Sequence, residues 1–195
     1  MRSRRILILD GHPDPDRKRF CHALADAYAA GAKTAGHEVR RVDLCTLDFP
    51  DLTRRDDWEA AAAPDAIIDV QQAILWAQHL VIIHPLWLGF MPARLKALFE
   101  QTLRPGFALG QRERIIGLGR LKGRSARIII TMGMPAVVFR VFYLAHSLRA
   151  TKRNILAFVG IAPTRSNVVG NVEGISDRQC ARWLQTISQL GRRGA

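Results

Sequence analysis

The loop after the first apolar run of the chain combines a histidine with a dense group of basic residues. The run Ile6–Leu9 is followed by His12 and then by Arg17–Arg19, directly before a helical pattern begins. The loop contains neither G-x-G-x-x-G nor G-x-x-x-x-G-K-[ST], so it does not indicate a Rossmann-type dinucleotide site or a nucleoside triphosphate site. Backbone N–H groups at a helix start nevertheless attract anions. The loop therefore favours binding of a phosphate group, and a solvated charged surface is the alternative.

Two later loops are apolar where polar turns would suffice. His84–Pro92 contains Trp87 and follows the apolar run Leu80–Ile83, and Thr131–Pro135 contains Gly133. Apolar loops at a surface indicate contact with a ligand or a partner, and a glycine permits close approach of the backbone. One phosphate-binding loop beside two apolar loops predicts a pocket for a flat ring with a phosphate tail. A flavin fits that description.

Other kinds of site are not indicated by the sequence. It contains no recognisable Ser/His/Asp set, carboxylate pair or cluster with metal-ligand spacing, so we expect no metal centre. The cysteines at positions 21, 45 and 180 form no close pair, which is typical of the reduced thiols of a cytoplasmic protein. Structural roles at strand ends are the alternative for His12 and His84.

Apolar runs alternate with amphipathic segments along the chain, and this alternation predicts the elements that position the loops. Strands are expected at residues 6–9, 38–44, 80–83, 127–131 and 165–169. Helical patterns begin near residues 20, 65, 92 and 176, a longer one spans about 137–157, and a single turn is expected around 58–62. Ser176 and Gln179 have the spacing of a capping box. This order predicts a parallel sheet with helices on both faces and a ligand at the carboxyl ends of the strands.

Composition indicates one globular domain over residues 1–195. The formal net charge is +12, with 29 Lys and Arg residues against 17 Asp and Glu residues. The basic residues are scattered, and densest from Arg104 to Arg127, without a nucleic-acid-binding motif, which favours a solvated face over a nucleic-acid interface. The apolar stretches Leu80–Ala93 and Ile128–Phe139 are shorter than the ~20 residues of a membrane-spanning helix. With no secretory segment at its start, we expect a cytoplasmic protein.

Three segments of the chain form recognisable motifs. They read I-L-I-L-D-G-H-P-D-P near the start, H-P-L-W-L-G-F-M-P-A-R-L-K-A-L-F-E in the middle and T-M-G-M-P after the fourth strand. Together they resemble the flavodoxin-like NAD(P)H:quinone oxidoreductase family, which includes quinone reductases, drug-activity modulators and potassium-efflux ancillary proteins. The resemblance covers essentially the whole chain. It implies a flavodoxin-like three-layer α/β sandwich with a five-stranded parallel sheet in the order 2-1-3-4-5 and helices on both faces.

The resemblance also implies a noncovalently bound flavin, FMN or FAD, held by the three loops. The residues implied are, for the phosphate, His12, Lys18, Arg19, Phe20, Cys21 and Ala23; for one side of the ring, Pro85, Leu86, Trp87 and Leu88; and for its other edge, Thr131, Met132, Gly133 and Met134.

Two positions depart from the family pattern. Arg19 and Cys21 flank Phe20 where many relatives have a hydroxyl residue and an asparagine, so backbone amides would have to hold the phosphate. Near the site of hydride transfer, Phe139 aligns with a tyrosine of some relatives. His146 aligns approximately with their histidine, which makes it the candidate catalytic residue.

The activity implied by the resemblance is that of an NAD(P)H dehydrogenase acting on quinones. NAD(P)H reduces the flavin and leaves, and a quinone-like acceptor then takes the hydride in the same place, by a ping-pong mechanism. The alternative is a flavin-binding ancillary subunit docked on a membrane transporter. No amphipathic anchor or lipidation motif points to a membrane, which favours the free-standing reductase.

A homodimer is also expected. Relatives in the family pair so that both chains border each flavin. In this chain the long link between residues 45 and 63 carries Phe49, Leu52 and Trp58, which offer apolar surface for a second copy to cover.

Overall fold

A computed structural model describes residues 3–59, 62–110 and 119–195. Its five strands form one parallel sheet in the order β2-β1-β3-β4-β5, so the predicted order is confirmed. The strands are β1 (Arg5–Asp10), β2 (Glu38–Asp43), β3 (His79–Pro85), β4 (Ser125–Thr131) and β5 (Thr164–Val169). The apolar runs of β1 and β3 lie at the centre of the sheet, where both faces of a strand are covered.

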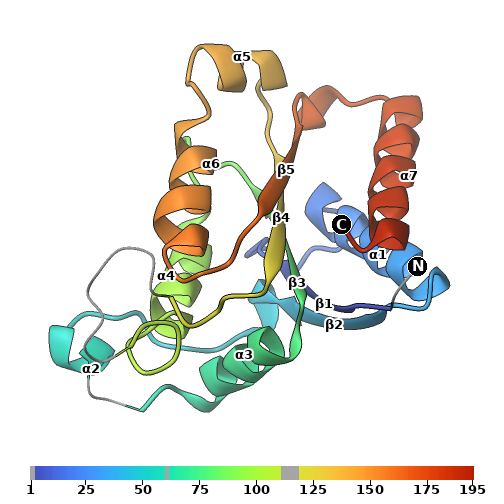
Figure 1. The fold of residues 1–195 in the computed structure, drawn as a ribbon. Helices are drawn as coiled ribbons and strands as arrows, with labels where there is room; N and C mark the ends of the chain where they lie inside the picture. Colours follow the sequence, from blue (N-terminus) through green and yellow to red (C-terminus); the bar gives the residue numbers. More distant parts are fainter. Residues whose placement is uncertain (1–2, 60–61, 111–118) are drawn as a thin grey trace.

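Helices cover both faces of this sheet (Figure 1). Alternate residues of β1 point to opposite sides: Ile6 and Ile8 pack with α1 and α7, whereas Leu7 and Leu9 pack with the other helices. The helices are α1 (Phe20–Thr34) and α7 (Asp177–Arg193) on one face; α3 (Asp65–Trp76), α4 (Ala93–Thr102) and α6 (His146–Ala150) on the other; and the short α2 (Arg55–Glu59) and α5 (Ala136–Val141). Within the described residues no helix combines the length and the apolar character needed to cross a bilayer.

Helices α1 and α7 touch along their backbones. A Cβ atom added to Gly31 would lie 2.0 Å from the carbonyl oxygen of Ser188, and one added to Gly191 would lie 2.2 Å from that of Tyr28. This close packing brings the end of α7 to the start of the chain, where Arg4 donates a hydrogen bond of 2.9 Å to the carbonyl oxygen of Gly194.

The helix expected over residues 137–157 is broken, so that prediction was wrong in its continuity. Helix α5 ends at Val141, Leu144 and Ala145 adopt left-handed conformations with φ of 49° and 48°, and α6 then leads into a π-helical segment, Thr151–Ala157. The apolar sequence suits a helix throughout, but α5 stands beyond the carboxyl ends of β4 and β5 (Figure 1), and the chain must turn to cover the sheet.

Two other local predictions can be compared with the structure. The helical turn expected at 58–62 lies earlier, as α2, and residues 60 and 61 lie outside the described part of the chain. The capping box before α7 is confirmed: the Ser176 backbone N–H donates to Gln179 Oε1 at 3.1 Å, and the Gln179 N–H donates to Ser176 Oγ at 3.4 Å. Part of the basic segment Arg104–Arg127, residues 111–118, is also outside the described residues.

Candidate functional site

The three loops singled out in the sequence meet at one edge of the sheet because their strands are neighbours in parallel register. Pro85 of β3 pairs with Thr131 of β4, and Asp10 of β1 pairs with Ile83 of β3. Backbone hydrogen bonds continue this pairing past the strand ends: Gly11 N–H donates to the Ile83 carbonyl, and Leu86 N–H donates to the Thr131 carbonyl, both at 2.7 Å.

A cavity of about 460 Å³ opens between the second loop, the third loop and the turn between α5 and α6. Its volume lies in the range of ~300–1,000 Å³ that is usual for sites of small molecules and cofactors. The lining residues are Leu86, Leu88, Gly89, Met132, Gly133, Met134, Phe139, Tyr143, His146 and Ser147. The structure thus brings Leu86, Leu88, Met132, Gly133, Met134 and His146 together, as the resemblance implies.

Three of the residues implied for the flavin ring do not line this cavity. Pro85 and Thr131 are buried strand ends beneath the loops. Trp87 is 48% exposed and stands edge-on to the ring of His12, with the ring centroids 5.9 Å apart. Trp87 therefore lies between the first loop and the cavity and connects the two regions.

The second loop makes a tight hairpin turn that presents a leucine to solvent. Trp87 and Phe90 exchange backbone hydrogen bonds of 2.8 and 2.9 Å, and the two residues between them, Leu88 and Gly89, have φ of 45° and 78°. Positive φ at both central residues is the geometry of a type I′ turn, which is costly for a leucine. Leu88 is fully exposed. A strained, exposed apolar residue at the mouth of a cavity indicates contact with a ligand or a second protein.

The first loop is shaped by its own side chains. Asp14 N–H donates to His12 Nδ1 at 3.1 Å, Asp16 N–H donates to Asp14 Oδ1 at 2.9 Å and Lys18 N–H donates to Asp16 Oδ1 at 3.0 Å. The guanidinium of Arg19 is held by the Asp14 carboxylate at 2.7 Å, whereas the side chain of Lys18 is exposed. Of the two basic residues expected to bind phosphate, Arg19 is therefore already paired with a carboxylate of the same loop.

The start of α1 remains the anion-binding feature of this loop. Arg19 occupies the N-cap position and makes no side-chain hydrogen bond to the helix. No acidic residue lies in the first turn. Phe20 and Ala23 are half-buried on this turn. The uncapped N–H groups and the helix dipole offer a phosphate group a favourable position.

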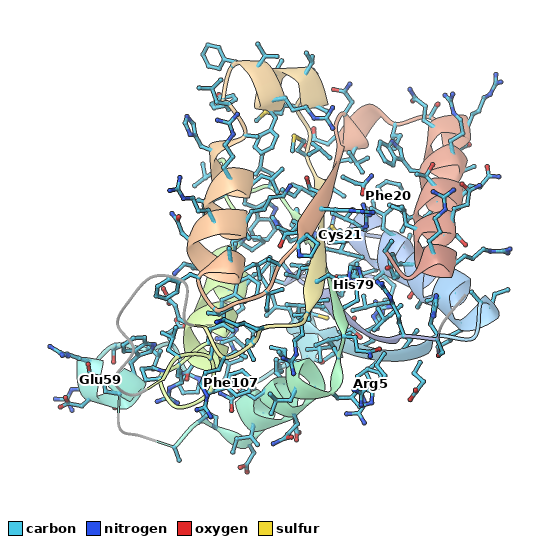
Figure 2. All side chains as sticks on the ribbon, viewed as in Figure 1. Arg5, Phe20, Cys21, Glu59, His79 and Phe107 are labelled. Carbon is cyan, nitrogen blue, oxygen red and sulfur yellow. The ribbon has the colours of Figure 1, made fainter. Side chains whose placement is uncertain are left out.

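Cys21, labelled in Figure 2, lies where α1 meets the sheet and does not line the cavity. Its Sγ lies 3.2 Å from Thr131 Oγ1, and both side chains are buried. Burial raises the pKa of the Cys21 thiol to about 12, so it stays protonated and unreactive at neutral pH. Among the expected site residues, Cys21 and Thr131 thus join helix to strand behind the site.

A buried ionic cluster beneath the first loop was not predicted from the sequence. Asp10 is completely buried, and its Oδ2 accepts hydrogen bonds from His22 Nδ1 at 2.6 Å and from Arg41 at 2.8 Å. Arg41 also donates to Asp43 at 2.7 Å and to Asp26. Potential ligand atoms of Asp10, His22 and Asp43 lie within 4.8 Å of one another. Because Arg41 donates to both carboxylates, a guanidinium already supplies the positive charge that a metal ion would bring.

The hydrogen bonds in this cluster orient its two histidines. His22 Nδ1 faces the Asp10 carboxylate, and His22 Nε2 donates to the carbonyl oxygen of Asp14 at 2.9 Å. Asp10 also accepts the backbone N–H of His12. Because a carbonyl oxygen can only accept, the hydrogen on His22 Nε2 is fixed by this contact. Burial lowers the pKa of His12, and the nearby His22 acts in the same direction, which keeps His12 neutral.

Tyr143, Gly89 and Ser147 are cavity residues that the sequence reasoning missed. Tyr143 precedes His146 by three residues, and both line the cavity together with Phe139. Phe139 is buried, whereas Tyr143 is 47% exposed. The Tyr-x-x-His spacing was the available signal.

Comparison with known proteins agrees with this architecture. A family model described as a flavodoxin-like fold matches residues 4–190. The chain is 26% identical over 187 residues to an uncharacterized NAD(P)H oxidoreductase of Haemophilus influenzae, covering 94% of this chain and 92% of that protein. Among solved structures, an NAD(P)H:quinone oxidoreductase from Methanothermobacter marburgensis has a TM-score of 0.80 at 23% identity, covering 98% of this chain and 97% of that one, which shows the shared fold.

Two further relatives match over shorter segments. An FMN-dependent NADH:quinone oxidoreductase of Ruegeria pomeroyi is 27% identical over 134 residues, or 58% of this chain. A glutathione-regulated potassium-efflux system ancillary protein, KefG, of Cronobacter sakazakii is 34% identical over 97 residues, or 48% of this chain. Several curated relatives are matched over only 49–63% of their own length.

Proposed function

Since this chain belongs to the family of flavodoxin-like proteins that its residues 4–190 match, we propose that it is a flavin-dependent NAD(P)H oxidoreductase acting on quinone-like acceptors. The observation that carries the proposal is the juxtaposition of an apolar cavity of about 460 Å³ with the uncapped start of α1 at the same edge of the sheet. An apolar wall suits a flat ring, and free backbone N–H groups suit the phosphate of the same ligand.

Different parts of the site would hold the ring and the phosphate of FMN or FAD. Leu86, Met132 and Met134 would exclude water from the ring, and Gly133 would let the backbone approach it. The first turn of α1 would hold the phosphate through backbone N–H groups. When bound, the flavin supplies the chemistry, accepting a hydride from NAD(P)H and passing it to the acceptor.

The α5–α6 turn would orient the second substrate. Tyr143 and His146 are the polar, exposed side chains of the cavity wall, and each can offer a hydrogen bond to a quinone oxygen. We assign His146 the catalytic role implied by the family and Tyr143 a role in positioning the acceptor.

Flavin titration tests the proposal. The purified protein should bind FMN or FAD at micromolar concentration, measured by quenching of flavin fluorescence. Gly133→Leu should weaken binding at least about tenfold, equivalent to ~1.4 kcal/mol, because a Cβ at this cavity-lining position lies 3.0 Å from the Glu173 carboxylate and the larger side chain must displace the cavity wall. Gly174→Leu is the matched control, since a Cβ at Gly174 meets no atom within 4 Å. A folded protein that takes up neither flavin would refute the proposal.

Steady-state kinetics with NADH, NADPH and a panel of quinones test the shared substrate position. Parallel double-reciprocal lines are expected, because NAD(P)H must leave before the acceptor enters. Intersecting lines would contradict a shared position.

An ancillary role on a transporter is the second candidate, favoured by the similarity to KefG. Negligible turnover with every acceptor, together with stoichiometric capture of a transporter from membranes, would favour this role over the reductase.

A homodimer with a shared site is the expected assembly. Apolar side chains are exposed from α5 to the following turn, next to the cavity: Val137, Val138, Val141, Phe142, Tyr143 and Leu144. Phe142 is 77% exposed and Val141 69% exposed, which is unusual for residues of this size on a monomer surface. A second chain placed here would border the cavity.

Phe142→Glu should convert the dimer to a monomer, measured by size-exclusion chromatography with light scattering. A charge on this surface would have to be buried without a partner in the dimer. Leu75→Glu is the control, because Leu75 is 44% exposed on α3, away from the cavity. A monomeric mass for the unmodified protein at working concentration would reject this assembly.

A further inference from the structure

A second cavity lies at the opposite edge of the sheet, where the strands begin. Its volume is about 250 Å³. It is built by the segment before β1, the starts of β3, β4 and β5, and the end of α7; the lining residues are Arg4, His79, Ser125, Ala126, Pro163, Arg165, Arg193 and Ala195. None of these residues lines the cavity of the proposed flavin site.

The arginines around this cavity have no Asp or Glu partner. Within residues 3–59, 62–110 and 119–195, no Asp or Glu side chain forms an ion pair with Arg4, Arg127, Arg165 or Arg193. Arg4 donates to the Gly194 carbonyl at 2.9 Å, and Arg127 donates to the backbone oxygen of Ala195 at 2.6 Å. Arg4 and Arg127 are thus engaged by the last residues of the chain, whereas Arg165 and Arg193 make no side-chain hydrogen bond within the described residues and can reach a ligand.

Arg127 adds a buried positive charge beside the cavity. It is 5% exposed, and its other recorded partner is the amide oxygen of Asn167. Burial lowers the pKa of Arg127, and the positive charge of Arg165 acts in the same direction. An anion placed nearby would relieve this repulsion.

His79 adds a buried polar atom without a partner. Its side chain is labelled in Figure 2. It is 3% exposed, Nδ1 lies 2.8 Å from Ser125 Oγ, and Nε2 has no hydrogen-bond partner among the residues that the structure describes. Burial lowers the pKa of His79 to about 4, and Arg127, Arg4 and Arg165 act in the same direction. The cavity is thus lined by the guanidinium donors of Arg4, Arg165 and Arg193, with the His79 ring beside them.

We propose that this cavity binds a phosphate group, either as inorganic phosphate or as a small phosphate monoester. Guanidinium groups pair with phosphate oxygens through two parallel hydrogen bonds, and the cations here reach the cavity from separate elements. Donors arriving from several directions suit a tetrahedral oxyanion better than a planar carboxylate. The volume also exceeds the ~30 Å³ share of a single water, so a small group fits. The proposal does not depend on the flavin site.

Nuclear magnetic resonance of the His79 ring nitrogens tests the proposal, because it reports on this cavity alone. Inorganic phosphate and glycerol phosphate are each titrated at neutral pH and constant ionic strength, with acetate as the comparison. A saturable shift of His79 Nε2 with phosphate, and a weaker one with acetate, is expected. If both phosphates bind equally the site takes the group itself, and tighter binding of glycerol phosphate would identify a monoester site.

Arginine variants make the test specific. Arg165→Gln combined with Arg193→Gln should abolish the saturable shift; both side chains are exposed and without recorded hydrogen bonds, so the fold should survive. Arg178→Gln is the matched control, since Arg178 lies fifteen residues earlier on α7, ~22 Å away along the helix. No saturable shift, an equal response to acetate, or an unchanged response in the double variant would overturn the proposal. Flavin binding is measured separately, so its failure would not affect this result.

Discussion

Replacing Asp10 with asparagine is expected to lower the free energy of unfolding by about 3–5 kcal/mol, the usual cost of removing one partner from a buried ion pair. The Asp10 carboxylate is completely buried and accepts hydrogen bonds from His22, from Arg41 and from the backbone of His12. An amide offers one acceptor oxygen in place of two, and its NH₂ group would face donors. The variant would leave the Arg41 guanidinium without its buried counter-charge and the His22 ring without its carboxylate partner. Chemical denaturation of the two proteins measures the difference.

Asp26→Asn is the matched control, because Asp26 pairs with the same arginine from an exposed position. Its side chain is 64% exposed, whereas Asp10 is 0% exposed. Exposed ion pairs contribute ~0–1 kcal/mol, so the control should unfold close to the unmodified protein. If Asp10→Asn cost no more than Asp26→Asn, the cluster would not be the charged network that its hydrogen bonds indicate.

The sheet and the edge that holds the candidate site could be predicted from the sequence. Each buried strand is a short apolar run, and the change from apolar residues to glycine, proline and histidine marks its end, as after Leu9 and Ile83. Parallel order then places these ends side by side. The cavity residues Leu86, Met132 and Gly133 follow directly from that argument, because they are the first residues past the strand ends.

The ionic cluster could not be predicted in the same way. Asp10, His22 and Arg41 lie on β1, α1 and β2, and only the packing of α1 over the β1–β2 pair brings them together. In the sequence each looks like an ordinary surface charge or helix residue. The break between α5 and α6 was missed for a related reason. Leu144 and Ala145 carry no glycine or proline signal, and a left-handed conformation is uncommon for such residues.

Acidification from pH 6.5 to pH 4 is expected to destabilise the protein by about 3 kcal/mol for each of two buried histidines, from a slope of ~1.4 kcal/mol per pH unit. Burial lowers the pKa of His84 to about 4, and burial together with the nearby arginines lowers the pKa of His79 to about 4. In the unfolded chain both rings take up a proton near the ordinary value of 6.5. Between these values the unfolded state binds more protons, so stability falls as the pH falls.

His84→Leu removes one of these two histidines and so isolates its contribution to the loss of stability at low pH. His84 Nδ1 donates to the Pro85 carbonyl at 2.9 Å, and His84 Nε2 is buried without a partner. Loss of the one hydrogen bond costs ~1 kcal/mol, and that cost is independent of pH. The slope is therefore the diagnostic quantity. Urea denaturation at several pH values should show a shallower decline below pH 6.5 in the variant and parallel behaviour above pH 8. If the unmodified protein and the variant lost stability at the same rate on acidification, His84 would be protonated in the folded state and the prediction would be wrong. Burial opposes that protonation, because within the described residues no acceptor faces His84 Nε2.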